Sequence, residues 1–289
     1  MHSYRLRPGW SLSSTTDGEL RVFDEDREII VRAPSGMQVM LEALTRALPP
    51  PPSMLDAILE LERRGAVVKH DPGRDPHARA SRQLEYFEAF TNDPEVVQHH
   101  LESRRLLIVG LGGTGSEFLR HMVAVGVQNY FLIDQDVVDV SNFNRQSLYE
   151  RSDLGRPKVD AAQRFVSARL RSARCDVLKA TVRADDDFAL TIETFEPSLV
   201  FVAIDEPVET IGRDLSLMMD RMGVPYLIAG VGIRHGRVHA VSSAPDPSVP
   251  VAGTPASLTT TNAMVAAQAA HRAVEFLTGM RLPFEVHDG

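Results

Sequence analysis

The sequence is poor in cysteine and lacks a long apolar segment. Cys175 is the only cysteine among the 289 residues. A disulfide within one chain needs two cysteines and a cysteine-based zinc site needs several, so neither is expected. No apolar run approaches the roughly 20 residues of a membrane-spanning helix. Since the start MHSYRLRPGW also lacks the apolar core of a signal peptide, we expect a cytoplasmic protein with no membrane partner.

An excess of positive charge is also missing. The formal net charge is −8, whereas a general nucleic-acid binder presents a basic surface, so no nucleic-acid partner is expected. The ten histidines form no HExxH motif, and the pair His99-His100 reads as solvated helix surface. Hydrophobic residues at 43% and charged residues at 24% are typical of a globular protein with a real core.

The first 80 residues indicate a small α/β domain. Two segments have the partial alternation of strands, and the next carries apolar residues at helical spacing. Pro49 to Pro52 end that helix, and Ser53 is the expected N-cap of the next one, with Asp56 in the capping-box position. The expected elements are strands 19–23 and 28–32, a helix over 37–48, a second helix ending at Gly65, and a strand over 66–69. This order resembles a winged helix.

Strands and helices alternate from Leu106 onward, which is the pattern of a parallel α/β sheet with helices on both faces. We therefore predict a Rossmann-like domain over residues 81–289, after a helical connector over 81–100. The expected strands cover 106–109, 130–133, 176–179, 199–202, 226–228 and 237–242, and the expected helices cover 115–125, 159–170 and 263–277.

A glycine-rich turn joins the first of these strands to the first helix. It reads Gly110-Leu111-Gly112-Gly113-Thr114-Gly115. Glycines let the backbone turn sharply and approach a phosphate, while the helix N-terminus offers free N–H groups to an anion. The alternative is a tight turn without a ligand. In its strand-turn-helix context, the motif favours a nucleotide bound by Gly110, Gly112, Gly113 and Gly115.

Asp134 ends the second predicted strand, about twenty residues beyond the glycines. A carboxylate at this place accepts hydrogen bonds from ribose hydroxyls in dinucleotide-binding proteins. This spacing fits NAD as well as ATP, so it leaves an oxidoreductase open.

The residues after Asp134 favour ATP over NAD. A polar stretch from Asp136 to Gln146 contains Arg145, and Lys158 follows a turn that opens a helix. Two cations near the glycine turn suit an enzyme that expels pyrophosphate, because negative charge builds up on the phosphates during that step. A dehydrogenase does not need them. The alternative is an ordinary surface ion pair for Arg145 and a first-turn charge for Lys158.

Asp205 lies at the end of a buried strand. Ligands bind beyond the carboxyl ends of strands in open α/β sheets. Magnesium prefers oxygen ligands and is commonly shared between carboxylates and phosphates. We therefore predict that Asp205 binds magnesium.

Together these residues resemble the ThiF/MoeB/ubiquitin-activating-type adenylating superfamily, which includes the adenylating enzymes of thiamine and molybdopterin biosynthesis. The resemblance covers residues from about 82 to 279. It rests on the family order of the glycine turn, Asp134, Ser141-Asn142, Arg145-Gln146, Pro157-Lys158 and Asp205.

The resemblance implies a role for each motif. Asp134 would hold the ribose, while Asn142, Arg145 and Lys158 would contact the triphosphate of magnesium-ATP. Asp136 and Gln146 are expected to complete the ATP-binding set. Arg82 resembles an arginine that reaches into the ATP site of a partner subunit, which implies a homodimer.

The sequence departs from the family pattern in two ways, and these departures point to one subset of the family. Many relatives carry zinc-binding CxxC pairs and a loop cysteine that forms a thioester, but residues 245–258 contain no cysteine. Cys175 is far from that loop in sequence and is expected to be a small core residue. This organisation resembles the microcin-maturing peptide-adenylating enzymes, which have an N-terminal winged-helix clamp for a leader peptide. Residues 1–80 would then bind the leader through an exposed strand edge.

The preferred hypothesis is therefore ATP-dependent adenylation of a carboxylate on a ribosomally made peptide. A nitrogen would capture the adenylate to give an amide, a cyclised product or a phosphorus–nitrogen bond. Adenylation of the Gly-Gly end of a sulfur-carrier protein is one alternative, and a non-catalytic peptide-binding scaffold is another. An NAD-dependent oxidoreductase would bind NADH more tightly than ATP.

Overall fold

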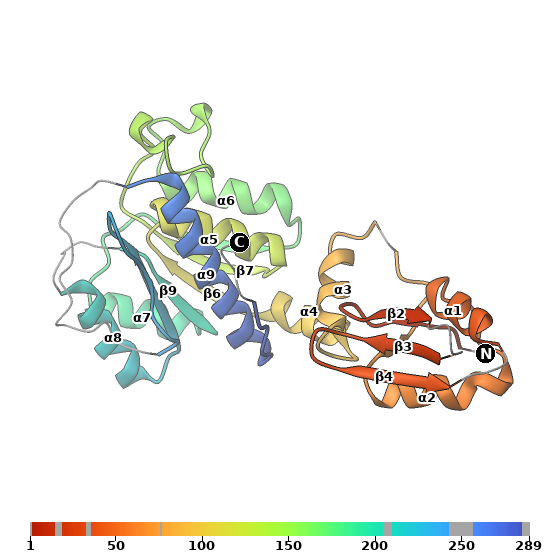
Figure 1. The fold of residues 1–289 in the computed structure, drawn as a ribbon. Coiled ribbons are helices and arrows are strands. Elements are labelled where there is room, and N and C mark those ends of the chain that lie inside the picture. Colours follow the sequence, from red (N-terminus) through yellow and green to blue (C-terminus); the bar gives the residue numbers. More distant parts are fainter. Residues whose placement is uncertain are drawn as a thin grey trace. The chain divides into compact units, whose positions relative to one another are not determined.

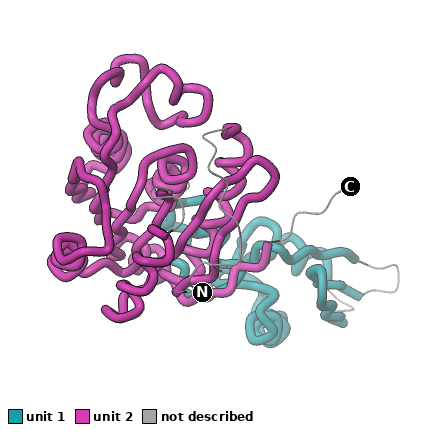
Figure 2. The backbone as a smooth tube through the Cα atoms, turned by 90° about the vertical axis from the view of Figure 1, so that its left-hand side faces the viewer, with its two compact units in different colours: residues 1–96 teal, residues 97–289 magenta. Residues whose placement is uncertain are grey.

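The computed structural model describes residues 2–14, 19–32, 36–75, 77–204, 210–242 and 257–284. The chain divides into two compact units, residues 1–96 and 97–289, which Figure 2 distinguishes by colour. The division falls within helix α4 (Pro94–Ser103). None of the described helices combines the length and apolar character that crossing a membrane requires.

The N-terminal unit contains two small antiparallel sheets. One has the order β2-β3-β4, and the other pairs β1 with β5. Its elements are β1 (Tyr4–Leu6), β2 (Ser11–Ser14), β3 (Glu19–Phe23), β4 (Glu28–Arg32), α1 (Met37–Thr45), the 3₁₀ turn η1 (Pro52–Met54), α2 (Leu55–Arg63), β5 (Val67–Lys69) and α3 (Ser81–Glu88). The strands at β3 and β4 match their predicted ranges, whereas β1 and β2 were not predicted.

Alternation along β3 builds the core of this unit. Leu20 and Val22 are fully buried, and they pack with Met40 and Leu44 of α1 and with Ile58 of α2. Alternate residues of the strand are buried, and they pack against helix residues that recur about once per helical turn.

The predicted cap at Ser53 is wrong. Ser53 lies inside the η1 turn, and α2 starts from Met54 without a side-chain cap. The polyproline segment fixes the backbone before Ser53 and leads it directly into the 3₁₀ turn, so the helix begins later than the capping pattern indicated.

The C-terminal unit is built on a six-stranded sheet with the order β11-β10-β9-β6-β7-β8. All neighbouring pairs are parallel except β10 and β11. The strands are β6 (Arg105–Val109), β7 (Asn129–Ile133), β8 (Arg174–Leu178), β9 (Leu199–Val202), β10 (Tyr226–Val231) and β11 (Gly236–Val238). This mostly parallel sheet confirms the predicted fold class, and its order reverses between β6 and β9.

Helices cover both faces of this sheet (Figure 1). The helical elements are α5 (Gly113–Val125), η2 (Val140–Asn142), η3 (Arg151–Asp153), α6 (Lys158–Arg169), α7 (Asp186–Phe195), α8 (Ile211–Met222) and α9 (Thr259–Thr278). Leu107, Val109 and Val200 form a buried cluster with residues of α7 and α8. Phe201 faces the opposite side, where its ring stacks on Phe118 of α5 at 3.7 Å between centroids. Helices α7 and α8 were not predicted.

Candidate active site

The glycine turn lies directly beyond β6, at the edge of the sheet where the strand order reverses. Gly110 has a φ of +92°, and a Cβ on it would lie 2.5 Å from the carbonyl oxygen of Ala203. A Cβ on Gly115 would lie 1.9 Å from the carbonyl oxygen of Gly110. Only glycine fits these two positions, because any side chain would collide with backbone. The turn therefore brings the start of α5 close to the ends of β6 and β9.

Asp134 fastens this turn to the end of β7. Its Oδ2 accepts a hydrogen bond from the backbone N–H of Leu111 at 2.6 Å, and its Oδ1 accepts one from Asp136 at 2.8 Å. Burial raises the pKa of the Asp134 carboxyl, while the charge of Lys158 and the two N–H donors oppose that rise. Each oxygen keeps acceptor capacity, so the carboxylate can both hold the turn and receive a ribose hydroxyl.

Tyr149 also holds the glycine turn in place, a role that the sequence did not indicate. Its hydroxyl donates to the carbonyl of Leu111 at 2.8 Å, and its side chain is buried. Burial and the negative charges of Asp134, Asp136 and Asp153 raise its pKa well above the usual value. Tyr149 therefore stays a neutral donor. Its position in a polar loop carried no motif that could have identified it.

Lys158 brings a positive charge to the same place. It begins α6 and is only 4% exposed, and its Nζ lies 2.7 Å from Oδ2 of Asp136. Its backbone N–H also donates to the Asp136 carbonyl at 3.0 Å, beside an isolated bridge between Val137 and Pro157. The loop after β7 is thus tied to the start of α6. The Lys158 ammonium is fixed before any ligand binds.

These groups surround one cavity of about 180 Å³. Its lining residues come from the ends of β6, β7, β8 and β9 and the start of α6: Val109, Gly110, Gly112, Ile133, Asp134, Gln135, Asp136, Lys158, Ala180, Thr181, Val182, Ala203 and Ile204. The structure thus brings together Gly110, Gly112, Asp134, Asp136 and Lys158, as the sequence predicted. Thr181, whose hydroxyl donates to Gln135 at 2.6 Å, belongs to the cavity without having been predicted.

The remaining glycine of the motif has a packing role. A Cβ on Gly113 would lie 2.5 Å from Oδ1 of Asn262, which also accepts a hydrogen bond from the Thr114 hydroxyl at 3.1 Å. Asn262 is 3% exposed and belongs to the first turn of α9. The start of α5 is thus held against the start of α9.

The polar stretch after Asp136 is organised by its own hydrogen bonds. Asn142 is buried and forms a capping box with Asp139. The Arg145 guanidinium donates to the Ser141 carbonyl at 2.8 Å. Gln146 is 2% exposed, and its Oε1 has no hydrogen-bond partner among the described residues. Within that part of the chain, none of these predicted residues lines the cavity. Their contacts with ATP stay predictions.

A buried acid connects this stretch to the glycine helix. Glu117 of α5 is 5% exposed and accepts a hydrogen bond from the Ser147 hydroxyl at 2.5 Å. It also pairs with Arg120 at 2.5 Å, and Arg120 donates to Ser147 at 2.8 Å. This triad fixes the residues after Gln146 relative to the turn. Sequence reasoning missed it.

Two predicted residues lie apart from this description. Asp205, the predicted magnesium ligand, falls outside the described residues. Arg82 is on α3 in the N-terminal unit, with its side chain 88% exposed and paired with Glu85 at 3.0 Å. Helix α3 is anchored inside its unit by Glu88, which pairs with Arg5 and with Arg74. Among the described residues, no three His, Cys, Asp or Glu side chains gather as a metal site.

The fold and this site agree with a family comparison. Residues 80–286 match the ThiF family, so the chain belongs to that family. The predicted membership of the ThiF/MoeB-type adenylating superfamily is thereby confirmed.

Individual relatives cover only part of the chain. The Nedd8-activating enzyme E1 catalytic subunit of Drosophila melanogaster is 34% identical over 114 residues, which is 39% of this chain and 21% of that protein. The chain therefore matches about a fifth of the length of this curated relative.

Solved structures resemble nearly the whole chain. Escherichia coli MccB with MccA-N7isoASN gives a TM-score of 0.75 at 17% identity, covering 96% of this chain and 90% of MccB. PaaA gives a TM-score of 0.73 at 18% identity, covering 96% and 92%. At these identities the likeness establishes the fold, including an N-terminal unit ahead of the sheet.

Proposed function

We propose that this protein is an ATP-dependent enzyme that adenylates a carboxylate on a ribosomally made peptide. One observation carries the proposal: a buried lysine and a glycine turn at the start of a helix meet a half-buried aspartate in one cavity. Free N–H groups at a helix N-terminus and a lysine favour phosphate oxygens, while Asp134 suits a ribose hydroxyl. NAD needs the glycines and the aspartate but has no use for Lys158.

The reaction is a substitution at the α-phosphorus of ATP. A carboxylate oxygen of the substrate forms a bond to this phosphorus, and the bond to the bridging oxygen of the β-phosphate breaks. Pyrophosphate leaves with the bonding electrons and carries the added negative charge. A fixed ammonium such as Lys158 stabilises this charge, because its position requires no reorganisation during the reaction. Arg145 is proposed to join it once ATP is bound.

Magnesium would accompany ATP and neutralise part of the triphosphate charge. The described carboxylates of the cavity are already engaged: Asp134 accepts two N–H groups, and Asp136 holds Lys158. They fit a supporting role better than direct ligation. We therefore keep Asp205 as the proposed ligand, and replacing it with asparagine should raise the magnesium concentration needed for half-maximal activity.

The peptide substrate is supported by the structural neighbours. One MccB structure contains ATP, and others contain MccA. In this chain, we propose that the N-terminal unit holds the leader along an outer strand of its β2-β3-β4 sheet, since peptides commonly bind by adding a strand to an exposed edge. A nitrogen nucleophile then captures the adenylate without an enzyme thioester. The cytoplasmic location expected from the sequence stays a prediction.

A protein tail ending in Gly-Gly is the second candidate substrate. The similarity to Nedd8-activating enzymes favours it, because those relatives activate a protein. A non-catalytic scaffold is opposed by the buried charge of Lys158, which is costly to retain in a protein without a use for it.

The deciding experiment is pyrophosphate and AMP release from magnesium-ATP. The full chain would be assayed with short peptides encoded beside its gene and with a protein ending in Gly-Gly, and products would be weighed by mass spectrometry. Pyrophosphate release with a peptide that loses water or gains a nucleotide supports the proposal. Release with only the Gly-Gly tail moves the substrate assignment, and ATP binding without release in any mixture supports a scaffold.

The proposed homodimer gives a separate test. We expect Arg82→Ala to abolish turnover without lowering the melting temperature, since this side chain is exposed. Mixing Arg82→Ala with Lys158→Ala should restore part of the activity if Arg82 completes the partner's site. Verified heterodimers without any recovery would contradict an action in trans.

A further inference from the structure

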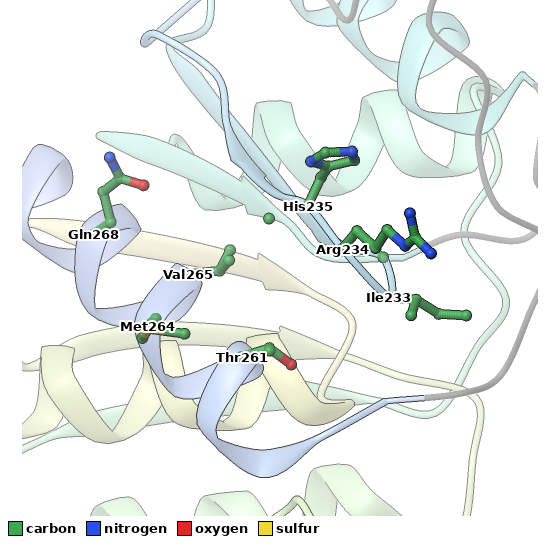
Figure 3. Close-up of a pocket in the computed structure, with 9 residues that line it drawn as sticks. Ile233, Arg234, His235, Thr261, Met264, Val265 and Gln268 are labelled. Atoms are coloured by element: carbon green, nitrogen blue, oxygen red, sulfur yellow. The ribbon is translucent and has the colours of Figure 1, made fainter.

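A second and larger cavity lies elsewhere in the C-terminal unit. Its volume is about 270 Å³, and the turn between β10 and β11 forms one wall while the first turns of α9 form the other (Figure 3). The turn contributes Gly232 to Gly236, and α9 contributes Thr261, Met264, Val265 and Gln268. We refer to these residues as the hairpin pocket.

The hairpin pocket is close to the proposed ATP cavity. Strand β10 runs parallel to β9, so its carboxyl end at Val231 lies at the same edge of the sheet as the end of β9. Thr261 lines the hairpin pocket, and the next residue, Asn262, contacts Gly113 in the glycine turn. The start of α9 thus contacts the glycine turn and also lines the hairpin pocket. A chain bound in the hairpin pocket can extend toward the ATP cavity.

Apolar groups form much of the hairpin pocket. Val265 is buried and points from α9 toward the strands in Figure 3, while Met264 is 65% and Ile233 66% exposed. A Cβ on Gly236 would lie 2.2 Å from Cγ2 of Val265, so the hairpin closes directly on the helix. Thr261 and Gln268 add hydrogen-bonding groups beside this surface. This combination suits one apolar side chain together with the peptide bonds next to it.

Arg234 is the charged residue of the described lining. Arg234 and His235 belong to its lining, and the described lining contains no Asp or Glu. In Figure 3 the Arg234 side chain extends from the tip of the turn, which places it at the rim. Burial lowers the pKa of His239 on the same hairpin, and the charges of Arg237 and Arg272 contribute in the same direction. Such a rim attracts an anion.

We propose that the hairpin pocket binds the reactive end of the substrate: an apolar side chain enters it, and the adjacent carboxylate is drawn by the basic rim. The inference rests on the proposed function and adds a specificity to it. The substrate carries an apolar residue within one or two positions of the carboxylate that becomes adenylated.

The test uses defined peptides and the full chain. The probes are acetyl-Ala-Xaa-Ala peptides with a free carboxylate and with leucine, glycine or glutamate as Xaa, plus the leucine peptide as its amide. Binding is followed by the NMR signal of Met264 in protein labelled with ¹³C-methyl methionine and assigned with Met264→Leu. The leucine peptide should bind at least about tenfold more tightly than the glycine peptide, because burying its side chain supplies that much affinity. Loss of the carboxylate should weaken it.

A matched pair of variants checks the location. Gln268→Trp fills the hairpin pocket and should remove the preference for leucine. Ala267→Trp places the same ring at an exposed neighbouring position of α9 that is not among the lining residues, and it should leave the preference unchanged. Both variants should keep wild-type ATP affinity. Equal binding of the leucine and glycine peptides, or an unaltered preference in Gln268→Trp, would overturn the proposal.

The outcomes separate the two proposals. Pyrophosphate release that depends on Lys158, without any response of Met264 to peptides, would refute the pocket and retain the enzyme. A leucine preference at Met264 with no pyrophosphate release from any substrate would retain the pocket and refute the adenylation.

Discussion

The two cavities at the carboxyl edge of the sheet differ in how their polar groups are held. Around the ATP cavity, Lys158 is buried, and Asp134 accepts two backbone N–H groups. In the hairpin pocket, Arg234 and His235 are exposed. A ligand that never varies, such as ATP, is best bound by groups whose positions are already fixed, since nothing has to reorganise during binding.

The side chains of the hairpin pocket are not fixed in this way. Exposed long side chains such as Met264 and Gln268 can rearrange around ligands of different shape. Under the proposed function, one fold combines a rigid cavity for ATP with an adaptable pocket for an individual substrate. The following substitutions test that contrast, from the largest expected effect to the smallest.

The ATP cavity should respond most strongly to loss of Lys158. Lys158→Ala is expected to reduce pyrophosphate release by a factor on the order of 10²–10³, because a fixed charge on the leaving group is removed. Lys158→Met keeps the apolar stem and should fail in the same way while preserving the melting temperature. Lys179→Ala, which removes an exposed lysine outside the cavity lining, is the control. Wild-type turnover in Lys158→Met would contradict the assigned role.

Substitutions in the glycine turn should distinguish a loss of stability from a loss of ATP affinity. Gly115→Ala drives a methyl group into the Gly110 carbonyl and should cost about 1–3 kcal/mol of unfolding free energy, as overpacking does. No atom lies within 4 Å of a Cβ built on Gly112, yet Gly112 lines the ATP cavity. Gly112→Ala should therefore keep the melting temperature and lose ATP affinity in calorimetry. Equal stability losses in the two variants would show that both glycines serve only the turn.

The contact between the starts of α5 and α9 should have a moderate effect. Asn262→Ala removes the acceptor of the Thr114 hydroxyl and two donor bonds, to Ser257 and Leu258. Leaving buried groups unpaired should cost about 1–3 kcal/mol, seen as a fall of several degrees in melting temperature. Thr260→Ala, at an exposed site of the same turn, provides the comparison. A stable Asn262→Ala variant would mean that the two helix starts are held by packing alone.

Cys175 should have the smallest effect. Burial, together with the charge of Asp176, raises its pKa to about 12. Below that pH the thiol is protonated, so it is a poor nucleophile at neutral pH. Cys175→Ser should retain full adenylation activity. Alkylation of the wild type by iodoacetamide should accelerate about tenfold per pH unit between pH 7 and 10 without a plateau, because the thiolate fraction grows in that proportion. Cys175 is half-buried on β8, so the predicted core position is only partly met. A plateau near pH 8 would contradict the raised pKa of its thiol.

The residues around the ATP cavity could be predicted well from the sequence. Buried runs at β6, β7 and β9, the glycines, Asp134 and Lys158 belong to a local pattern in which residue order itself carries the spatial relation. The turn needs glycine for steric reasons that are independent of the rest of the chain. This is why the predicted ATP residues Gly110, Gly112, Asp134, Asp136 and Lys158 meet at one cavity.

Long-range contacts escaped prediction. Tyr149 reaches Leu111, and Glu117 reaches Ser147, only because the chain folds back, and neither residue stands in a recognisable motif. The hairpin pocket joins residues 232–236 to residues 261–268, which lie far apart in the sequence. Strand β2, with the sequence SLSS, was missed because its alternation is too weak to stand out from a loop. Helix α8 is amphipathic, but its many polar residues hid its buried face.

The packing of Gly113 against Asn262 has a consequence for recombination between related proteins. The ATP cavity uses residues between 109 and 204, whereas the hairpin pocket uses residues between 232 and 268. A crossover placed in α8 would therefore transplant the proposed substrate pocket as a single contiguous piece. The graft must keep an asparagine against the glycine, since that is where donor and recipient segments would meet. Diversity in substrate choice could arise from such exchanges while the nucleotide chemistry passes on unchanged.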